Sequence, residues 1–329
     1  MLEANNTKFS LDWLVHTFDL GEPYNIVQAG YGQTNKLGVL RLETSLGLFA
    51  IKRSEQAPKP VALSIEETAY KTGFPLPRPI WAVDGKLCAS YLNEEDTIWV
   101  RVYSWVDGTP YNWGFVSEEV AKKVGGLLAA IHALPLSNSE LQNEPYIPLG
   151  RSGWQQLTEQ AIAKNLDWAF LLQNKISTLV EWEEYIISNT VNDEPFVPSQ
   201  KDLHPPNIIR CCNGNHVVVD WDDAGVVNAR EEVAKFALVW ATVPGQPPQP
   251  DAVHAFIRGY REVGGHFESR GILDLTYQAR TRLWWLAYNV RRDVSECPGH
   301  VSDLTSALLS GVHPLDLEVL KCTTALFQF

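Results

Sequence analysis

Alternating apolar and polar residues dominate the first hundred positions of the chain. This pattern predicts strand, turn, strand, turn, strand over residues 24–53, and two more strands at 87–92 and 98–105. The segment 61–71, which a glycine and a series of prolines follow, predicts a short helix. The first part of the chain is therefore expected to form a small, mostly antiparallel sheet with one inserted helix.

The apolar spacing changes to that of helices after residues 106–110. An apolar stripe at intervals of three and four residues runs from Val120 to Ile131, and the segments 154–190 and 251–295 show more helical pattern. A short strand–loop–strand element at 196–220 separates these two segments. The second part of the chain is therefore expected to be mostly helical.

The length of the chain, 329 residues, exceeds that of a usual single domain, so two lobes are expected. The change of pattern divides them into an amino-terminal, sheet-containing lobe of residues 1–106 and a larger helical lobe of residues 107–329. One continuous mixed domain is the alternative that the sequence leaves open.

The composition is that of an acidic globular protein. Lysine and arginine number 27 and aspartate and glutamate 39, which gives a formal net charge of −12. An excess of negative charge argues against non-specific binding to nucleic acid or to an anionic membrane, because both need basic patches. It is compatible with a cationic ligand, although solubility is the simpler explanation.

Cysteine usage and apolar runs bear on location. The five cysteines are odd in number and show no CxxC spacing, so we expect reduced thiols, with neither a disulfide framework nor a zinc site. The amino terminus has no basic segment followed by an apolar one, and the longest apolar run, 236–243, is far shorter than a membrane span of about 20 residues. A cytoplasmic protein is expected.

Residues with the chemistry of phosphoryl transfer gather in the segment between the helical stretches. Asp202 and Asn207 lie five positions apart in a proline-containing loop, and Asp220 follows a β-branched strand thirteen positions after Asn207. One carboxylate can orient an attacking hydroxyl, while an amide oxygen and a second carboxylate can hold Mg²⁺ on nucleotide phosphates. A single DxxxxN is a weak signal, but both acidic elements at this spacing on strand-like segments are a stronger one.

The first part of the chain supplies matching groups. Gly30-Tyr31-Gly32 forms a turn in which the backbone can approach phosphates closely, although Asn35 stands where a GxGxxG motif has its third glycine. Lys52 ends a predicted strand and can bring an ammonium to the phosphates, and Glu66 or Glu67 on the following helix can pair with it. Taken alone, these residues are equally well explained as a surface lysine and solvated glutamates.

Residues 24–240 resemble the aminoglycoside phosphotransferase family, which has the protein-kinase-like fold. The resemblance is carried by seven segments in family order and at family-like spacing: Gly30 to Asn35, Phe49 to Lys52, Phe74 to Pro79, Val102 to Gly108, Leu128 to Leu134, Asp202 to Asn207, and Asp220 to Gly225. The branch that is most similar acts on peptide antibiotics of the viomycin and capreomycin type. The resemblance implies an α+β, bilobal fold with a small antiparallel sheet and one helix in the first lobe and a larger, mostly helical second lobe.

The resemblance also implies which residues bind the nucleotide. Lys52 would hold the α- and β-phosphates of ATP, with Glu66 as its partner. Ser104 and Val106 would offer backbone groups to the adenine, in the strand that becomes the hinge between the lobes. The first lobe would thus be the nucleotide-binding lobe, and the second would carry the catalytic loop and the acceptor site.

The remaining roles implied by the resemblance are catalytic. Asp202 would accept or orient the hydroxyl proton of the acceptor, and Asn207 and Asp220 would ligate Mg²⁺. His204 lies two positions after Asp202, where related kinases often carry a lysine that faces the γ-phosphate. A protonated His204 serves there, or the residue packs the loop, and both interpretations stay open.

Two local features refine this interpretation. Many family members carry His-Gly before the catalytic Asp, where this chain has Gln200-Lys201; Gln200 can make part of the hydrogen bonds of that histidine, and Lys201 favours ionisation of Asp202. Only about ten residues separate Asp220 from the helix predicted near Arg230, which leaves no room for the activation loop of a protein kinase.

We therefore expect a Mg²⁺- and ATP-dependent kinase that phosphorylates a hydroxyl of a small cationic molecule of aminoglycoside or peptide-antibiotic type, an antibiotic-resistance activity. Asp222 and Asp223 are the candidate acceptor contacts, unless they cap the next helix or pair with arginines such as Arg230. The alternatives are a kinase of a cellular metabolite, such as choline, homoserine or a fructosamine-like sugar, and a catalytically inactive nucleotide-binding protein of the same fold.

Overall fold

The computed structural model describes residues 9–30, 37–92, 96–136, 146–190, 196–295, 302–310 and 323–328. The chain divides into two compact units: residues 1–115, 130–141 and 198–226 form the first, and residues 116–129, 142–197 and 227–329 form the second. The segment 198–226, far along the chain from the amino-terminal strands, belongs to the first unit. The polar residues predicted at 202, 207 and 220 therefore lie in the same unit as Lys52.

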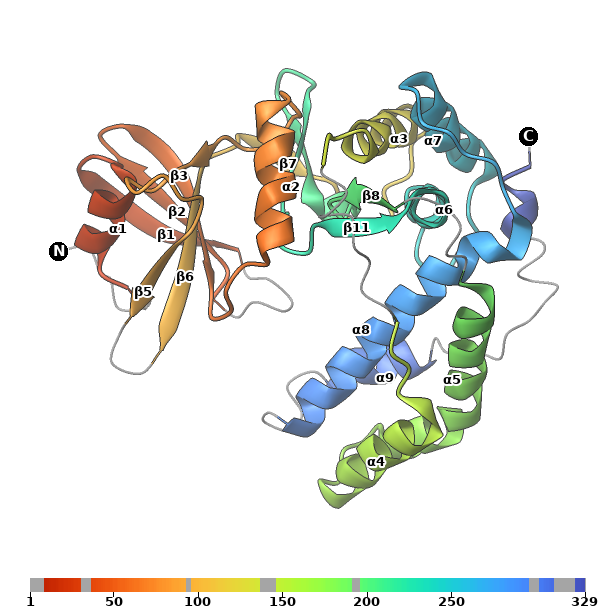
Figure 1. Ribbon diagram of the computed structural model, residues 1–329. Helices are drawn as coiled ribbons and strands as arrows, with labels where there is room; N and C mark the ends of the chain where they lie inside the picture. The colour runs from red at the N-terminus through yellow and green to blue at the C-terminus, as the bar shows by residue number, and fades with distance from the viewer. Residues whose placement is uncertain are drawn as a thin grey trace. The chain divides into compact units, whose positions relative to one another are not determined.

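The first unit contains a six-stranded antiparallel sheet (Figure 1). Its strands are β1 (Pro23–Gly30), β2 (Val39–Thr44), β3 (Gly47–Ser54), β4 (Pro79–Ile80), β5 (Ala89–Leu92) and β6 (Thr97–Ser104). They follow the order β1-β2-β3-β6-β4, and β5 also pairs with β6. The predicted strands over 24–53, 87–92 and 98–105 are confirmed, whereas the two-residue strand β4 was too short for the pattern to indicate.

A short helix that the sequence pattern did not predict completes the core of this sheet. Helix α1 (Leu11–Phe18) begins at Ser10, whose hydroxyl accepts a hydrogen bond from the backbone N–H of Trp13. Leu14 and Phe18 pack against buried residues of β2, β3 and β6, such as Ile51. Burying side chains of this size contributes about 1.5–3 kcal/mol each, so the helix is held by packing.

Helix α2 (Pro60–Lys71) confirms the predicted helix, and the first unit also holds a second, smaller sheet. In that sheet β9 (Ile208–Cys211) lies between β7 (Gly108–Pro110) and β10 (His216–Val218). The single helical turn η1 (Pro205–Asn207) leads into β9. Together these elements place the loop around Asp202 next to the chain that follows β10.

The rest of the chain is mostly helical, as predicted. The helices are α3 (Glu118–His132), α4 (Gly150–Ala163), α5 (Ala169–Asn189), α6 (Ala229–Val239), α7 (Pro250–Glu262), η2 (Gly271–Leu275), α8 (Thr276–Ser295) and α9 (Ser302–Ser310). Strands β8 (Phe196–Ser199) and β11 (Gly225–Asn228) form a two-stranded sheet. None of the helices in the described ranges has the length and apolar character needed to cross a membrane.

Two close contacts organise the second unit. Helices α4, α5, α8 and α9 pack around one apolar cluster that includes Trp154 and Trp168 (Figure 1). Helices α3 and α7 approach so closely that a Cβ at Gly125 or Gly259 would collide with backbone of the other helix. Glycine is therefore required at both positions of that crossing.

A buried carboxylate caps helix α4 from a neighbouring helix. The backbone N–H groups of Leu149 and Gly150 donate to Glu183 of α5 at 2.8 and 3.0 Å. The residue at the N-cap position of α4 provides no side-chain hydrogen bond, so Glu183 satisfies these donors instead. Burial, together with the charge of Glu183, also raises the pKa of Tyr146 above its ordinary value.

We expect the Glu183→Ala substitution to lower the free energy of unfolding by about 2–3 kcal/mol, because two buried N–H donors lose their acceptor. Glu184→Ala is the matched control: Glu184 is the next residue of α5 and is exposed, so its change should stay within about 0.5 kcal/mol. Urea unfolding monitored by circular dichroism measures both. Equal effects of the two substitutions would contradict the capping role.

Candidate functional site

The loop that carries Asp202 is held by the side chain of Gln200, which is fully buried. Its amide nitrogen donates to the carbonyl oxygens of Val219 at 3.1 Å and Asp220 at 2.5 Å, and its amide oxygen accepts from the N–H of Asp202 at 2.9 Å. One side chain thus ties the backbone at 202 to the backbone at 219–220. Gln200 provides hydrogen bonds of the kind expected of the family histidine that this chain lacks.

Two residues of these segments have left-handed backbone. Lys201 has φ 67° and Asp220 has φ 61°. For a residue other than glycine this conformation costs roughly 1–2 kcal/mol. The hydrogen bonds of Gln200 to the backbone of Asp202, Val219 and Asp220 offset that cost. The two segments therefore keep the turns that direct Asp202 and Asp220.

Asp202 and Asn207 are in direct contact, which their separate predicted roles did not include. The amide nitrogen of Asn207 donates to the carboxylate of Asp202 at 2.7 Å and to its backbone carbonyl at 2.9 Å. The other carboxylate oxygen of Asp202 lies 3.2 Å from Nε2 of His204. Because its NH₂ group serves Asp202, Asn207 is left with its amide oxygen for a metal ion.

Lys52 is brought to the chain after β10 by two ion pairs. Its ammonium lies 2.5 Å from the carboxylate of Asp220 and 2.7 Å from that of Asp222, and the lysine side chain is only 15% exposed. Asp222, predicted as an acceptor contact, thus lies beside the predicted phosphate-binding lysine.

The pKa values of this pair are displaced in the same direction for different reasons. Burial lowers the pKa of Lys52 below its ordinary value, although the charge of Asp220 opposes the shift. Burial would raise the pKa of Asp220, but the charge and hydrogen bond of Lys52 and the charge of Arg101 outweigh it and lower that pKa. Asp220 is therefore ionised at neutral pH.

Glu66 does not pair with Lys52 as the sequence led us to expect. Its carboxylate lies 2.9 Å from the guanidinium of Arg101, and Arg101 also forms an ion pair with Asp222. Arg101 on β6 is the register partner of Lys52 on β3, so both cations stand on the same face of the sheet. The geometry of the guanidinium accounts for the difference, because its fork can bind two carboxylates at once.

The cluster around Lys52 therefore contains two cations (Lys52 and Arg101) and three carboxylates (Glu66, Asp220 and Asp222), which leaves one negative charge. Sequence reasoning missed Arg101, although a charged residue in the middle of an apolar strand was a signal that could have found it. Among His, Cys, Asp and Glu of the described residues, no group of three is arranged as a metal site. A metal ion here would need the amide oxygen of Asn207 and atoms of a bound ligand besides Asp220, as is usual for Mg²⁺.

Of the other predicted nucleotide contacts, Gly30 ends β1, Ser104 ends β6 and Val106 follows β6. The N–H of Ser104 already donates to the carbonyl of Arg78 at 2.9 Å, and in the described part of the chain the N–H of Val106 has no protein acceptor. Gly30 ends β1 with open space where a Cβ would be. Tyr31 and Gly32 lie outside the described residues.

The side chain of Asp223 has a different partner from that of Asp222 and makes a weak contact. It is 3.4 Å from Lys59, and both side chains are exposed. Neither aspartate caps the following helix, because Asn228 accepts from the N–H of Glu231 at the start of α6. The alternative in which these aspartates cap that helix is therefore wrong.

The alternative of pairing with an arginine holds for Asp222, but the partner is not Arg230. Arg230 forms an ion pair with Asp274 within the second unit. The arginine that Asp222 contacts is Arg101 instead.

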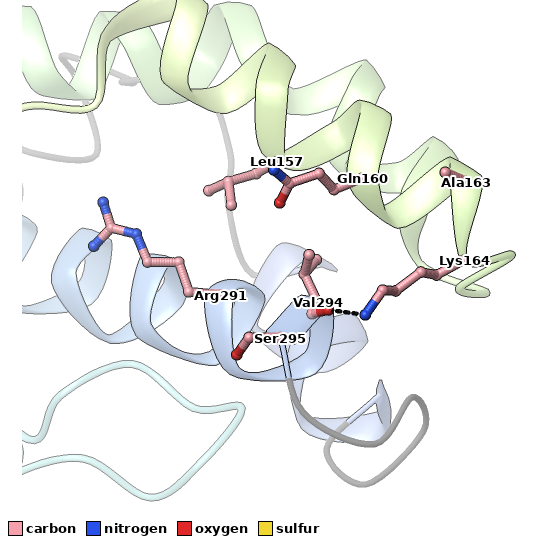
Figure 2. A pocket seen from close by; sticks show the side chains of 7 residues that line it. All are labelled: Leu157, Gln160, Ala163, Lys164, Arg291, Val294 and Ser295. Carbon is pink, nitrogen blue, oxygen red and sulfur yellow. Dashed lines mark hydrogen bonds between the residues drawn. The ribbon is translucent and has the colours of Figure 1, made fainter.

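A cavity of about 500 Å³ in the second unit contains none of the predicted residues. Figure 2 shows it between α4 and α8, with Lys164 reaching the carbonyl of Val294. A lysine at the carboxyl end of a helix is a stabilising contact. The lining contains no carboxylate that could accept a proton or hold a metal ion, so the candidate site stays with the residues around Lys52 and Asp202.

The comparisons with known proteins identify the family of the chain. The model of the phosphotransferase enzyme family matches residues 52–269, about two thirds of the chain, and the chain belongs to that family. It is a small-molecule phosphotransferase with an alcohol group as acceptor. No curated protein matches the chain in sequence.

Solved structures with the same fold cover nearly the whole chain. Spectinomycin phosphotransferase APH(9)-Ia, in complex with ADP and spectinomycin, is 14% identical with a TM-score of 0.71, over 96% of this chain and 97% of that one. Amicoumacin kinase hAmiN is 13% identical with a TM-score of 0.62, over 95% and 96%. Choline kinase LicA from Streptococcus pneumoniae is 16% identical with a TM-score of 0.58, over 89% and 94%. The predicted α+β, protein-kinase-like fold is confirmed.

The two neighbouring glutamates of α2 give a test of the buried ion pair. Glu66→Ala should lower the free energy of unfolding by about 3 kcal/mol or more, because Arg101 keeps a buried charge with a partner removed. Glu67→Ala removes only a surface pair with Lys71 and should cost about 0.5 kcal/mol or less. Denaturant unfolding of the two variants checks this, and a similar loss in both would exclude a special role for Glu66.

Proposed function

We propose that this kinase transfers the γ-phosphoryl group of ATP to a hydroxyl of a small cationic molecule. The observation that carries the proposal is the linkage of Asp202, held by Asn207, to Asp220, held by Lys52, through the side chain of Gln200. A carboxylate open to solvent and a carboxylate paired with a buried ammonium are the two acidic elements that phosphoryl transfer requires.

On the nucleotide side, Lys52 exchanges its carboxylate partners for the α- and β-phosphates of ATP. We assign phosphate binding to the turn that the sequence predicts at Gly30-Tyr31-Gly32, and adenine binding to the backbone at Ser104 and Val106. Of these two, Val106 provides the N–H donor, since that of Ser104 is in use. Arg101 keeps Glu66 and Asp222 in place and adds a second positive charge to the site. We assign this role to the lobe of residues 1–106, and the catalytic loop and acceptor site to residues 107–329.

The residues present fit a divalent cation, which we take to be Mg²⁺. The amide oxygen of Asn207 and the carboxylate of Asp220 would hold it, and the surplus negative charge of the site attracts it. When bound, such an ion neutralises charge on the transferring phosphoryl group. Complexes of similar structures contain ADP, AMP, or AMP-PNP with Ca²⁺, which supports the use of a nucleotide and a divalent cation.

Asp202 orients the acceptor hydroxyl and takes its proton as the phosphoryl group is transferred. Asn207 fixes one oxygen of this carboxylate, so the other oxygen, on the side of His204, is the one that meets the hydroxyl. His204 holds that oxygen in position and, when protonated, brings positive charge toward the γ-phosphate. Catalysis then rests on positioning and charge neutralisation.

The acceptor is a small molecule that combines a hydroxyl with a positive charge. The similar structures include kinases of ethanolamine, aminopropanol and choline, all of them amino alcohols, besides the spectinomycin and amicoumacin enzymes. Asp223, which is exposed, draws such a cation toward the site, and Asp222 does so from the side of Lys52. An antibiotic of aminoglycoside or peptide type, which would make this a resistance enzyme, and a cellular amino alcohol remain the two candidate acceptors.

A catalytically inactive protein is the less favoured alternative. The feature that suggests inactivity is Gln200-Lys201 in place of the His-Gly of many family members. Gln200, however, hydrogen-bonds both segments of the site. We place the reaction in the cytoplasm, where ATP is available; the described cysteines, Cys88, Cys211 and Cys212, are free thiols.

The first test is Asp202→Asn, which keeps the shape of the side chain but removes its capacity to accept a proton. We expect turnover to fall by a factor of about 100 to 10,000, while the affinity for Mg·ATP changes little. Asp84→Asn, a change to an exposed carboxylate that pairs only with Lys86 on the surface, should leave both unchanged. ADP release across a panel of aminoglycosides and amino alcohols measures turnover; full activity of Asp202→Asn would remove this residue from the mechanism.

The second test separates the metal ligand from the proton acceptor. Asp220→Ala should weaken nucleotide binding in the presence of Mg²⁺ by a factor of about ten or more and have a much smaller effect in EDTA, because the lost group holds the ion. Isothermal titration with ATP under both conditions measures this. Equal losses with and without Mg²⁺ would argue against a metal-binding role for Asp220.

A further inference from the structure

An exposed indole stands beside the candidate catalytic loop. The side chain of Trp113 is 55% exposed, in a chain whose other large side chains include several tryptophans that are fully buried. It lies in a turn in which the N–H of Phe115 donates to the carbonyl of Asn112 at 3.1 Å and Gly114 has φ +79°. Glycine at the third position of such a turn allows the positive φ, so the turn presents Trp113 outward in a defined conformation.

The turn is anchored to the small sheet of the first unit. Tyr111 is buried; its N–H donates to the carbonyl of Ile208, and its hydroxyl lies 2.8 Å from Nε2 of His216. The ring of Phe115 packs on that of Tyr111, with 4.6 Å between centroids. Both ends of the turn are thus fixed, and the exposure of Trp113 is a property of the fold rather than of a loose loop.

The imidazole ring of His204 lies between the indole of Trp113 and the candidate catalytic carboxylate of Asp202. The ring centroids of Trp113 and His204 are 4.8 Å apart, and Nε2 of His204 lies 3.2 Å from the carboxylate of Asp202. That carboxylate is itself 41% exposed. The indole of Trp113 and the carboxylate of Asp202 are therefore both accessible to a small molecule. One imidazole ring, that of His204, lies between them.

We propose that Trp113 binds the cationic group of the acceptor while Asp202 receives its hydroxyl. This inference rests on the proposed function and names the substrate class: an alcohol with an ammonium group close to the hydroxyl that is phosphorylated. The negative face of the indole attracts an organic ammonium, and tryptophan does so better than the other aromatic residues. A neutral alcohol of the same shape gains only the apolar contact.

The binding test uses the full chain without nucleotide and two probes of the same shape. Choline carries the charge, and 3,3-dimethylbutan-1-ol is its uncharged isostere. We expect the wild type to bind choline about five- to tenfold more tightly than the isostere, as a partly desolvated cation–π contact allows. The Trp113→Phe variant should keep much of this preference, and Trp113→Leu, which retains apolar surface without the π-system, should lose it. Isothermal titration measures the dissociation constants.

A tryptophan of equal exposure serves as the control. Trp284 on α8 is 53% exposed, and Trp284→Leu should keep the preference for choline. The proposal is overturned if the wild type does not distinguish the two probes, if Trp113→Leu still does, or if Trp284→Leu loses the preference instead.

Steady-state kinetics give a second readout with the best amino-alcohol acceptor from the turnover panel. Trp113→Leu should raise the KM for that acceptor about tenfold and leave the KM for ATP unchanged, whereas a merely structural role would lower kcat and disturb both. Absence of ATP-dependent transfer to any acceptor would refute the proposed function. The binding comparison, made without nucleotide, would still decide the role of Trp113.

Discussion

The buried side chain of Gln200 is the contact on which the site depends. It bonds the backbone at 202 and at 219–220 simultaneously, and it does so next to two residues held in left-handed conformations. Its hydrogen bonds, together with the bond from the N–H of Lys201 to Ser199 and the ion pair of Asp220 with Lys52, oppose relaxation of these two residues to ordinary backbone angles. A single amide, donor on one side and acceptor on the other, is suited to this position because both segments present backbone groups.

The charges around Lys52 explain how a nucleotide site persists before any ligand is bound. Lys52 and Arg101 stand side by side on adjacent strands, and such a pair of cations would repel if it were left unscreened. Glu66, Asp220 and Asp222 neutralise them, and the pairs are partly shielded from water. A polyanionic ligand with its metal ion can therefore replace the carboxylates at Lys52 without creating an unpaired buried charge.

Arg101 changes which residues pair with which in the site. In the pairing expected from the family resemblance, a glutamate of the helix restrains the phosphate-binding lysine directly. Here the guanidinium of Arg101 forms ion pairs with both Glu66 and Asp222. One residue thus joins α2, β6 and the segment after β10. Among the described residues, the two carboxylates of that segment are the acidic partners that restrain Lys52.

The amino-acid sequence by itself determined most of the strands and helices, because their apolar periods are regular, and its motifs indicated the kinase-like class. It could not determine α1, whose eight residues are stable only against the sheet, nor the partner of Glu66. That partner depends on the register that sets Arg101 opposite Lys52, which is a property of strand pairing and leaves no trace in local spacing. The exposure of Trp113 beside His204 likewise depends on tertiary structure. These two residues are 91 positions apart and meet only when β7 pairs with β9.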